Sequence, residues 1–259
     1  MGEREELVFS AQLSETAERY DEMRDTMKEV VDLAAGNLTE EERNLLGACF
    51  KHCVSSRRTT ARMIASMEKK QPDESNKNKI KDFRSKVELE LTAICEDILA
   101  ILDAKLLPAA SAVDAKVFYQ KMKGDYLRYL AEIAGADQKK AVAAKCGDAY
   151  AEAQETAKTL STTSALRLGL SLNQSVFFFE IQEDADAACA ASKKAFEDAT
   201  ADLEEVASSS FEGGVEVSSV LDSSEYKKST EILQLLRDNL TLWTSGDKPA
   251  SESEPEGYK

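Results

Sequence analysis

Apolar residues recur every three or four positions along most of the chain, and this spacing predicts amphipathic helices rather than strands. The predicted helices cover residues 7–17, 20–31, 40–69, 80–107, 112–134, 139–160, 165–181, 184–206 and 225–243. The connections between them are short, which is typical of antiparallel neighbours. The pattern therefore predicts an all-α fold of about nine antiparallel helices.

Local signals support several of these boundaries. Thr39 followed by Glu42 forms a capping box that predicts the start of a long helix. Pro108 is expected to end the fourth helix, and Gly135 the fifth. The polar stretch 70–79, with Pro72, predicts a loop or a weakly held turn.

Two segments lack the helical period. Residues 207–224 are rich in serine and glycine and predict a long mobile loop. Residues 244–259 are acidic and contain two prolines, which predicts a disordered tail. We expect residues 1–243 to form a single helical domain.

The net charge of the chain and its cysteines indicate which classes of partner and which cellular compartment to expect. Lys plus Arg is 33 and Asp plus Glu is 48, so the net charge is −15. This charge argues against nucleic acid or anionic membrane as a general partner, because phosphates would be repelled. No apolar run approaches the roughly 20 residues of a membrane span, so membrane insertion is not expected. Five cysteines without a CxxC pair indicate free thiols and a cytoplasmic location, with the nucleus left open.

Residues for catalysis or metal binding are scarce. His52 is the only histidine, and Cys49 and Cys53 lie within one helical turn of it. A metal site there would need a further ligand, and buried packing of small thiols is the favoured interpretation. We find no glycine-rich phosphate loop and no dinucleotide fingerprint. An enzyme, a metal and a cofactor are therefore not expected.

Two cationic features stand out in this acidic chain. Lys121, Asp125 and Arg128 share one helical stripe, so that two cations surround one carboxylate. Lys51 and Arg58 are two turns apart and lie about 20° from one another on their helix. Spacing alone leaves an ordinary solvated basic face as the simpler interpretation of Lys51 and Arg58.

Two apolar stripes each carry an asparagine. The residues of the two stripes are Leu168, Leu172, Asn173, Val176 and Phe179, with Glu180 beyond them, and Ile232, Leu235, Asn239 and Trp243. Most such stripes pack in a core, but an amide on an apolar stripe requires hydrogen-bond partners. The donors and the acceptor of an amide suit the backbone of an extended peptide.

Long segments resemble the 14-3-3 family, in the same order along the chain. These segments are ERYDEM (18–23), EERNLL (41–46), AKVFY (115–119), MKGDY (122–126), RYLAE (128–132), RLGL (167–170), Asn173, SVF (175–177) and LLRDNLTLW (235–243). The resemblance extends from about Leu7 to Trp243. It implies a protomer that dimerises into a cup and binds phosphoserine or phosphothreonine segments of client proteins in an amphipathic groove.

By motif position, the resemblance assigns roles to individual residues. The phosphate-binding set is Lys51, Arg58, Arg128 and Tyr129, and the residues for the peptide backbone are Asn173 and Asn239. The groove wall is Leu172, Val176, Ile232, Leu235 and Trp243, and the polar groove positions are Lys121, Glu180 and Glu231. Glu231 stands where the family usually has leucine and is expected to favour a basic residue in the peptide.

The resemblance also implies a dimer, whether of two identical or two different chains. Its interface positions are Leu13, Ala17, Arg19, Glu22, Phe83, Lys86 and Glu90, with Arg19–Glu90 and Glu22–Lys86 as expected ion pairs between protomers. Exposed ion pairs contribute only about 0–1 kcal/mol each, so apolar contacts should dominate. An alternative function is an adaptor of the same fold that binds unphosphorylated partners.

Overall fold

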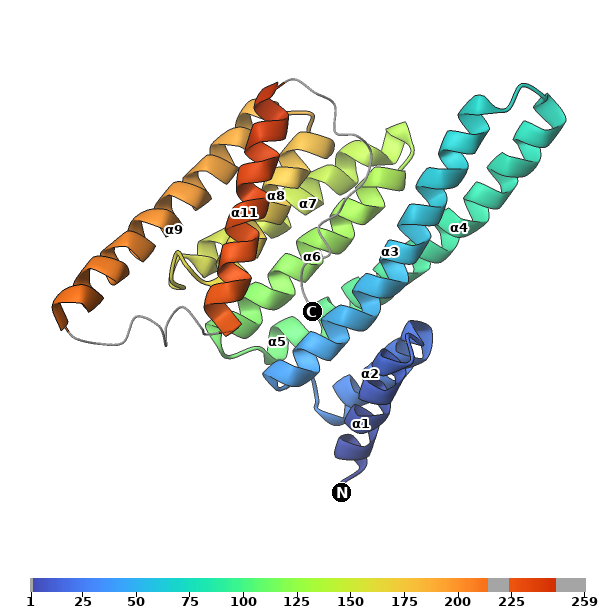
Figure 1. Cartoon of the computed structure of the whole chain (residues 1–259). Coiled ribbons are helices and arrows are strands. Elements are labelled where there is room, and N and C mark those ends of the chain that lie inside the picture. Colours follow the sequence, from blue (N-terminus) through green and yellow to red (C-terminus); the bar gives the residue numbers. More distant parts are fainter. Residues whose placement is uncertain (1, 214–223, 246–259) are drawn as a thin grey trace. The chain divides into compact units, whose positions relative to one another are not determined.

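The computed structural model describes residues 2–213 and 224–245, which are helical apart from short connections (Figure 1). The elements are α1 (Glu3–Thr16), α2 (Tyr20–Leu33), α3 (Glu40–Lys70), α4 (Glu74–Ile101), η1 (Leu102–Leu106), α5 (Leu107–Ala109), α6 (Val113–Ile133), α7 (Ala136–Ala157), α8 (Ala165–Glu180), α9 (Ala185–Gly213) and α11 (Ser224–Ser245). Within these residues no strand occurs and no helix is long and apolar enough to cross a bilayer. With α4, η1 and α5 counted as one continuous helix, the described residues form nine helices, and the predicted all-α class is confirmed.

The chain divides into two compact units. The first unit comprises residues 1–111 and 129–142, and the second comprises residues 112–128 and 143–259. Helices α6 and α7 each contribute one part to either unit.

The first unit is built from helices that pack on their neighbours in sequence. Helix α1 packs on α2, α2 on α3, and α3 on α4, and α3 and α4 form a long hairpin (Figure 1). Met23, Met27 and Val30 of α2 are fully buried, as are Leu46 and Phe50 of α3. Side chains spaced three or four apart thus supply the core of this unit, as the sequence pattern predicts.

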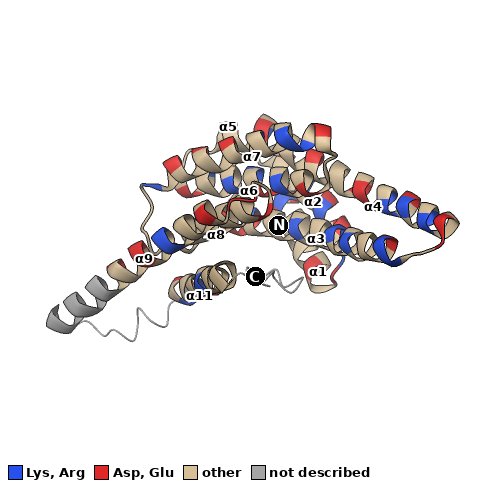
Figure 2. Cartoon of the chain, turned by 90° about the horizontal axis from the view of Figure 1, so that it is seen from above, with Lys and Arg blue, Asp and Glu red and all other residues tan. Residues whose placement is uncertain are grey.

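Charged side chains also link α3 to α4. Basic residues gather in the first half of α4 and acidic residues in its second half (Figure 2). From this basic half, Arg84 pairs with Glu68 of α3 at 3.1 Å and with Glu88 of α4 at 3.6 Å. Part of this basic stretch is therefore neutralised within the hairpin.

The predicted capping box opens α3. The Thr39 hydroxyl accepts a hydrogen bond from the Glu42 amide at 3.3 Å, and the Glu42 carboxylate accepts one from the Thr39 amide at 2.7 Å. Arg4 of α1 donates from Nε to the same carboxylate at 2.6 Å. Burial would raise the pKa of Glu42, but its hydrogen bonds to Arg4 and Thr39 outweigh this and lower the pKa.

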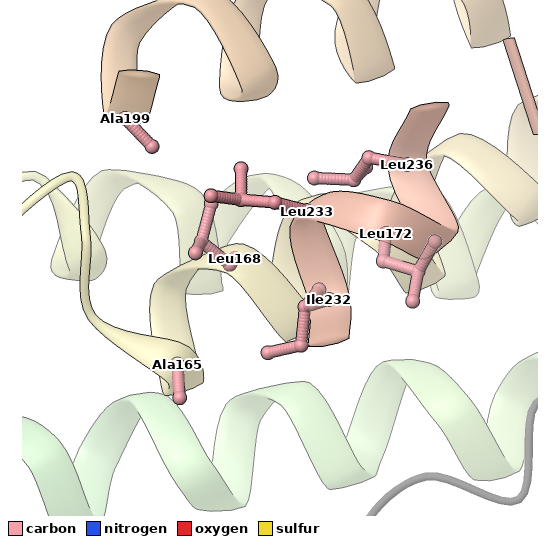
Figure 3. Close-up of a cluster of buried hydrophobic side chains, with 7 residues drawn as sticks. All are labelled: Ala165, Leu168, Leu172, Ala199, Ile232, Leu233 and Leu236. Carbon is pink, nitrogen blue, oxygen red and sulfur yellow. The ribbon is translucent and has the colours of Figure 1, made fainter. Parts of the chain in front are cut away.

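A second core joins α8, α9 and α11 in the second unit. Leu168 and Leu172 of α8 meet Ile232, Leu233 and Leu236 of α11 (Figure 3). Ala165 and Ala199 complete this cluster, and Leu235 packs against it. Because burial of each such side chain stabilises a fold by about 1.5–3 kcal/mol, this cluster holds the last helix in place.

The predicted loop at 70–79 is wrong, because only residues 71–73 separate α3 from α4. Asp73 is the N-cap of α4, and its carboxylate accepts a hydrogen bond from the Asn76 amide at 2.8 Å. An aspartate cap stabilises a helix start by about 1 kcal/mol, and it outweighs the polar composition of the first turn.

The predicted loop at 207–224 is wrong at its beginning and at its last residue. Helix α9 continues past Val206 to Gly213, and α11 begins at Ser224. Serine costs a helix only a few tenths of a kcal/mol per residue, so α9 propagates until glycine appears. The rest of the predicted loop, 214–223, lies outside the described residues. So does the predicted tail from residue 246 onward, whereas Thr244 and Ser245 belong to α11.

A π-helical turn, η1, follows α4 and approaches the end of α2. The Leu107 amide donates to the carbonyl of Leu102, five residues earlier. The carbonyl group of Lys105 lies against Gly36, which has a φ of +80°. A Cβ at Gly36 would lie 2.9 Å from the Lys105 carbonyl carbon, so this position requires glycine for its conformation and for its lack of a side chain.

We predict that Gly36→Ala destabilises the protein by roughly 1–3 kcal/mol from backbone strain, with the clash against Lys105 adding to the loss. Gly135→Ala is the matched control, since a Cβ there meets nothing within 4 Å. Chemical denaturation followed by circular dichroism measures both. Equal stability of the two variants would contradict the close approach.

Candidate ligand-binding site

Arg58 is a buried cation in the first unit, with a side chain that is only 3% exposed. Its Nε and one terminal nitrogen donate to the two carboxylate oxygens of Glu132 at 2.9 and 2.7 Å. Its guanidinium carbon lies 4.2 Å from the centre of the Tyr129 ring. The carboxylate and the ring therefore fix the plane of the guanidinium, and such a fixed fork suits planar oxyanions.

Lys51 lies on α3, two turns before Arg58, and is half-buried. Arg62, one turn after Arg58, approaches Glu132 at 3.4 Å. The helical conformation of α3 thus places Lys51, Arg58 and Arg62 along one face, as the seven-residue spacing of the first two predicts. The arrangement is more ordered than a solvated basic surface, because Arg58 is buried and held on two sides.

Asp125 is the centre of a second polar cluster, which belongs to the second unit. It accepts hydrogen bonds from the Lys121 ammonium at 2.8 Å, the Tyr150 hydroxyl at 2.7 Å and the Asn173 amide at 2.7 Å. Arg128 is 4% exposed, donates from Nε to the Tyr150 oxygen at 3.4 Å and approaches Glu180 at 3.9 Å. Asp125 thus organises side chains from α6, α7 and α8.

The electrostatics of this cluster fix its protonation. Burial would raise the pKa of Asp125, but the charges of Lys121 and Arg128 and the hydrogen bonds from Lys121 and Tyr150 outweigh it and lower the pKa. Burial and the charge of Asp125 raise the pKa of Tyr150 well above its ordinary value. Asp125 is therefore an acceptor at neutral pH and Tyr150 remains a donor.

Sequence reasoning missed three residues of these clusters. Glu132 orients Arg58, Tyr150 links Asp125 to Arg128, and Gly124 makes room for the Tyr150 ring. A Cβ at Gly124 would lie 2.6 Å from that ring. A glycine in the middle of a helix was the available signal, since it costs about 1 kcal/mol unless packing requires it.

The two asparagines occupy half-buried positions on α8 and α11. The bond to Asp125 is the only side-chain hydrogen bond that Asn173 makes with another described residue. Its carbonyl oxygen and second N–H thus remain for a ligand. Asn239 lies one turn before Trp243, whose ring stacks on Phe179 with centroids 4.9 Å apart.

The predicted apolar wall divides into two groups. Leu172 and Ile232 are buried in the α8–α9–α11 core, with Ile232 only 1% exposed. Val176, Leu235 and Trp243 are half-buried. The half-buried side chains can contact a ligand directly, whereas the buried Leu172 and Ile232 pack beneath them in the core.

The other predicted site residues are more exposed. Glu231 is exposed on α11, Glu180 is exposed at the end of α8, and Lys121 is half-buried beside Asp125. All seven predicted interface residues, from Leu13 to Glu90, are exposed in the single chain. Within that chain Arg19 pairs with Glu22, and Glu90 approaches Arg57 at 3.5 Å. The predicted pairs between protomers stay a prediction.

The thiols beside His52 are packed into the first unit. The Cys49 thiol donates to the Leu46 carbonyl at 3.1 Å, and burial raises the pKa of both Cys49 and Cys53, the latter to about 12. The His52 ring stacks on Tyr20 with centroids 4.0 Å apart. These contacts support packing rather than chemistry for this cluster.

Comparison with known proteins gives a consistent set of relatives. The family model described as "14-3-3 protein" matches residues 10–244. The 14-3-3-like protein 2 of Caenorhabditis elegans is 47% identical over 257 residues, which cover 97% of either chain. The 14-3-3-like protein of Helianthus annuus is 47% identical, with 93% of this chain and 90% of the relative covered. The 14-3-3 protein zeta of Bombyx mori is 46% identical, with 96% and 97% covered.

We predict that Asp125→Asn lowers the free energy of unfolding at pH 7 by about 3–5 kcal/mol, because it leaves the buried Arg128 and the half-buried Lys121 without their carboxylate. The contribution of ionised Asp125 is complete above its ordinary pKa of 3.8 and is lost as the pH falls below this value toward the lowered pKa. The gap between wild type and variant should therefore shrink in acid. Urea titrations at pH 7 and pH 3 measure it, with exposed Asp148→Asn as the control. A gap independent of pH would count against the ionised network.

Proposed function

The chain belongs to the 14-3-3 family, and from this premise we propose that it binds phosphoserine or phosphothreonine segments of client proteins and so regulates their activity, location or assembly. The family consists of adaptors rather than enzymes, and it is an established case of phosphomotif recognition by arginine clusters. The observation that carries the proposal is that two arginines, Arg58 and Arg128, are buried and oriented in a chain of net charge −15.

The proposed phosphate ligands are Lys51, Arg58, Arg128 and Tyr129. A phosphate group carries about −1.5 to −2 charges at pH 7 and three acceptor oxygens. Guanidinium forks bind such a group bidentately, with shorter and stronger hydrogen bonds than neutral donors give. Glu132 and Tyr129 hold Arg58, and Asp125 and Tyr150 surround Arg128, which reduces the ordering that ligand binding would otherwise require.

The other residues of the proposed groove would contact the peptide on both sides of the phosphate. Asn173 and Asn239 are assigned to its backbone, and Leu172, Val176, Ile232, Leu235 and Trp243 to its apolar side chains. The exposed carboxylates Glu180 and Glu231, with Lys121, are assigned to its polar side chains. A peptide bound through its backbone and one phosphate can vary at other positions, which suits an adaptor with several clients.

We predict that a phosphopeptide binds the full chain at least about tenfold more tightly than its unphosphorylated counterpart, since a charge-assisted hydrogen bond contributes about 1.5–3 kcal/mol. Lys51→Glu should abolish this preference because it places a carboxylate beside the phosphate. Lys69→Glu makes the same charge change at an exposed position of α3 and should preserve it. Fluorescence polarisation measures the affinities of the wild type and the two variants for both peptides, six in all. Equal affinity of the wild type for both peptides would favour the alternative, an adaptor for unphosphorylated partners.

The same proposal includes a dimer. Leu13 of α1 and Phe83 of α4 are 55% and 56% exposed in the single chain, and Phe9 is also exposed. Apolar side chains concentrated on one unit are typical of an interface. The dimer would be formed with an identical chain or with a related one, through the positions predicted from the sequence.

We predict that Leu13→Glu converts a dimer to monomers at micromolar concentration without unfolding the chain, because a buried carboxylate in an interface is unfavourable. Leu33→Glu is the control, since Leu33 is also exposed but lies at the far end of α2. Sedimentation equilibrium measures the mass of both variants. A wild-type chain that sediments as a monomer would refute the homodimer.

We also place the protein in the cytoplasm, with the nucleus as a second location. All five cysteines are free, and four of them are buried. Reduced thiols suit a reducing compartment. Fractionation of cells that express the chain checks this location, and recovery from a secreted fraction would contradict it.

A further inference from the structure

A cavity of about 210 Å³ lies among α7, α8 and α9 in the second unit. Its polar lining includes Gln154 from α7, Arg167, Ser171 and Gln174 from α8, and the Lys194–Asp198 pair from α9. The function proposed above uses none of these residues.

The cavity lies on the opposite face of α8 from the proposed peptide groove. At about 100° per residue, Arg167, Ser171 and Gln174 fall within an arc of about 60°. Leu172 and Val176 point about 140° and 180° away from Arg167 on the same helix. A ligand in this cavity would therefore be distinct from a peptide in the groove.

Arg167 gives the cavity an uncompensated positive charge. Its guanidinium donates to the Leu160 carbonyl at 2.7 Å, and it forms no ion pair with a carboxylate of the described residues. Lys194 and Asp198 lie 2.9 Å apart and neutralise one another. In a chain of net charge −15, a half-buried guanidinium without a carboxylate partner is a marked exception.

The amides beside Arg167 add further donors. The Gln154 amide nitrogen donates to the Ser171 hydroxyl at 3.2 Å and to the Gln174 carbonyl at 3.0 Å. Since this bond occupies the Gln174 oxygen, the amide nitrogen of Gln174 is left to donate. The remaining hydrogen-bonding groups of Arg167 and Gln174 are therefore all N–H donors. Such donors suit a ligand that is negatively charged and accepts hydrogen bonds.

We propose that this cavity binds a small oxyanion, the phosphate or carboxylate group of a small molecule, with Arg167 as its main ligand. Guanidinium forks bind both groups bidentately. The cavity of about 210 Å³ holds several water volumes of about 30 Å³ but is smaller than the roughly 300–1,000 Å³ of drug-sized sites. It suits an anion of a few heavy atoms rather than a nucleotide.

The test is calorimetric titration of the full-length chain with inorganic phosphate and, separately, with succinate. The better of the two probes identifies the preferred oxyanion. Arg167→Gln should weaken its binding at least about tenfold, because it removes a charge-assisted bond. Arg237→Gln makes the same charge change on exposed α11 and should leave the affinity unchanged. Binding of neither probe to the wild type, or equal binding to both variants, would overturn the proposal.

Two further variants separate this cavity from the groove and from effects on folding. Ala191→Leu fills the cavity from α9 without changing any charge, and it should weaken anion binding while the melting temperature stays near that of the wild type. Lys51→Glu disables the proposed phosphopeptide site and should leave anion binding intact. Binding that survives Ala191→Leu but is lost in Lys51→Glu would assign the anion to the groove and refute the cavity. If the chain does not bind the phosphopeptide but does bind the anion in the cavity, only the proposed function fails and the cavity proposal stands.

Discussion

The buried carboxylate of Asp125 is the interaction on which the arrangement of the second unit depends. An isolated buried charge is very unfavourable, so Asp125 is tolerated only because Lys121, Tyr150 and Asn173 all donate to it. These donors come from three helices, and each is fixed by the need to satisfy the same group. The positions of Arg128 and Asn173 are thus consequences of electrostatics as much as of apolar packing.

The first unit also contains a buried charge, but there the buried group is a cation. Arg58 is buried as a cation, and Glu132 and the Tyr129 ring compensate it. Removing one partner of such a buried pair costs more free energy than the intact pair contributes to folding. The pair therefore fixes the geometry of Arg58 rather than adding net stability. Both units therefore place an arginine where the apolar core alone would exclude it. Glu132 of α6 compensates Arg58, and Asp125, three residues before Arg128 on the same helix, compensates Arg128.

Most of the fold follows from the sequence, because helical periodicity, the Thr39 capping box and Gly135 are local signals. The errors also have local causes: the polar composition of residues 70–79 conceals the cap at Asp73, and the serines at the end of α9 are compatible with a helix. Among the site residues, Lys121 and Asp125 could be paired from spacing. Glu132 and Tyr150 could not, since their partners are far away in sequence and only tertiary packing brings them together. The binding roles of all the site residues, Asn239 and Glu231 included, stay predictions.

The ionisation of Asp125 has a consequence for the chemistry that Asn173 can offer. A carboxylate without a proton only accepts, so Asn173 must turn its nitrogen toward Asp125 and its oxygen away. A partner that meets this oxygen has to bring an N–H or a hydroxyl. Proline, whose backbone nitrogen carries no hydrogen, cannot supply that bond. The buried charge of Asp125 therefore restricts the sequence of a peptide bound across α8. The peptide residue whose backbone nitrogen faces the Asn173 oxygen cannot be proline.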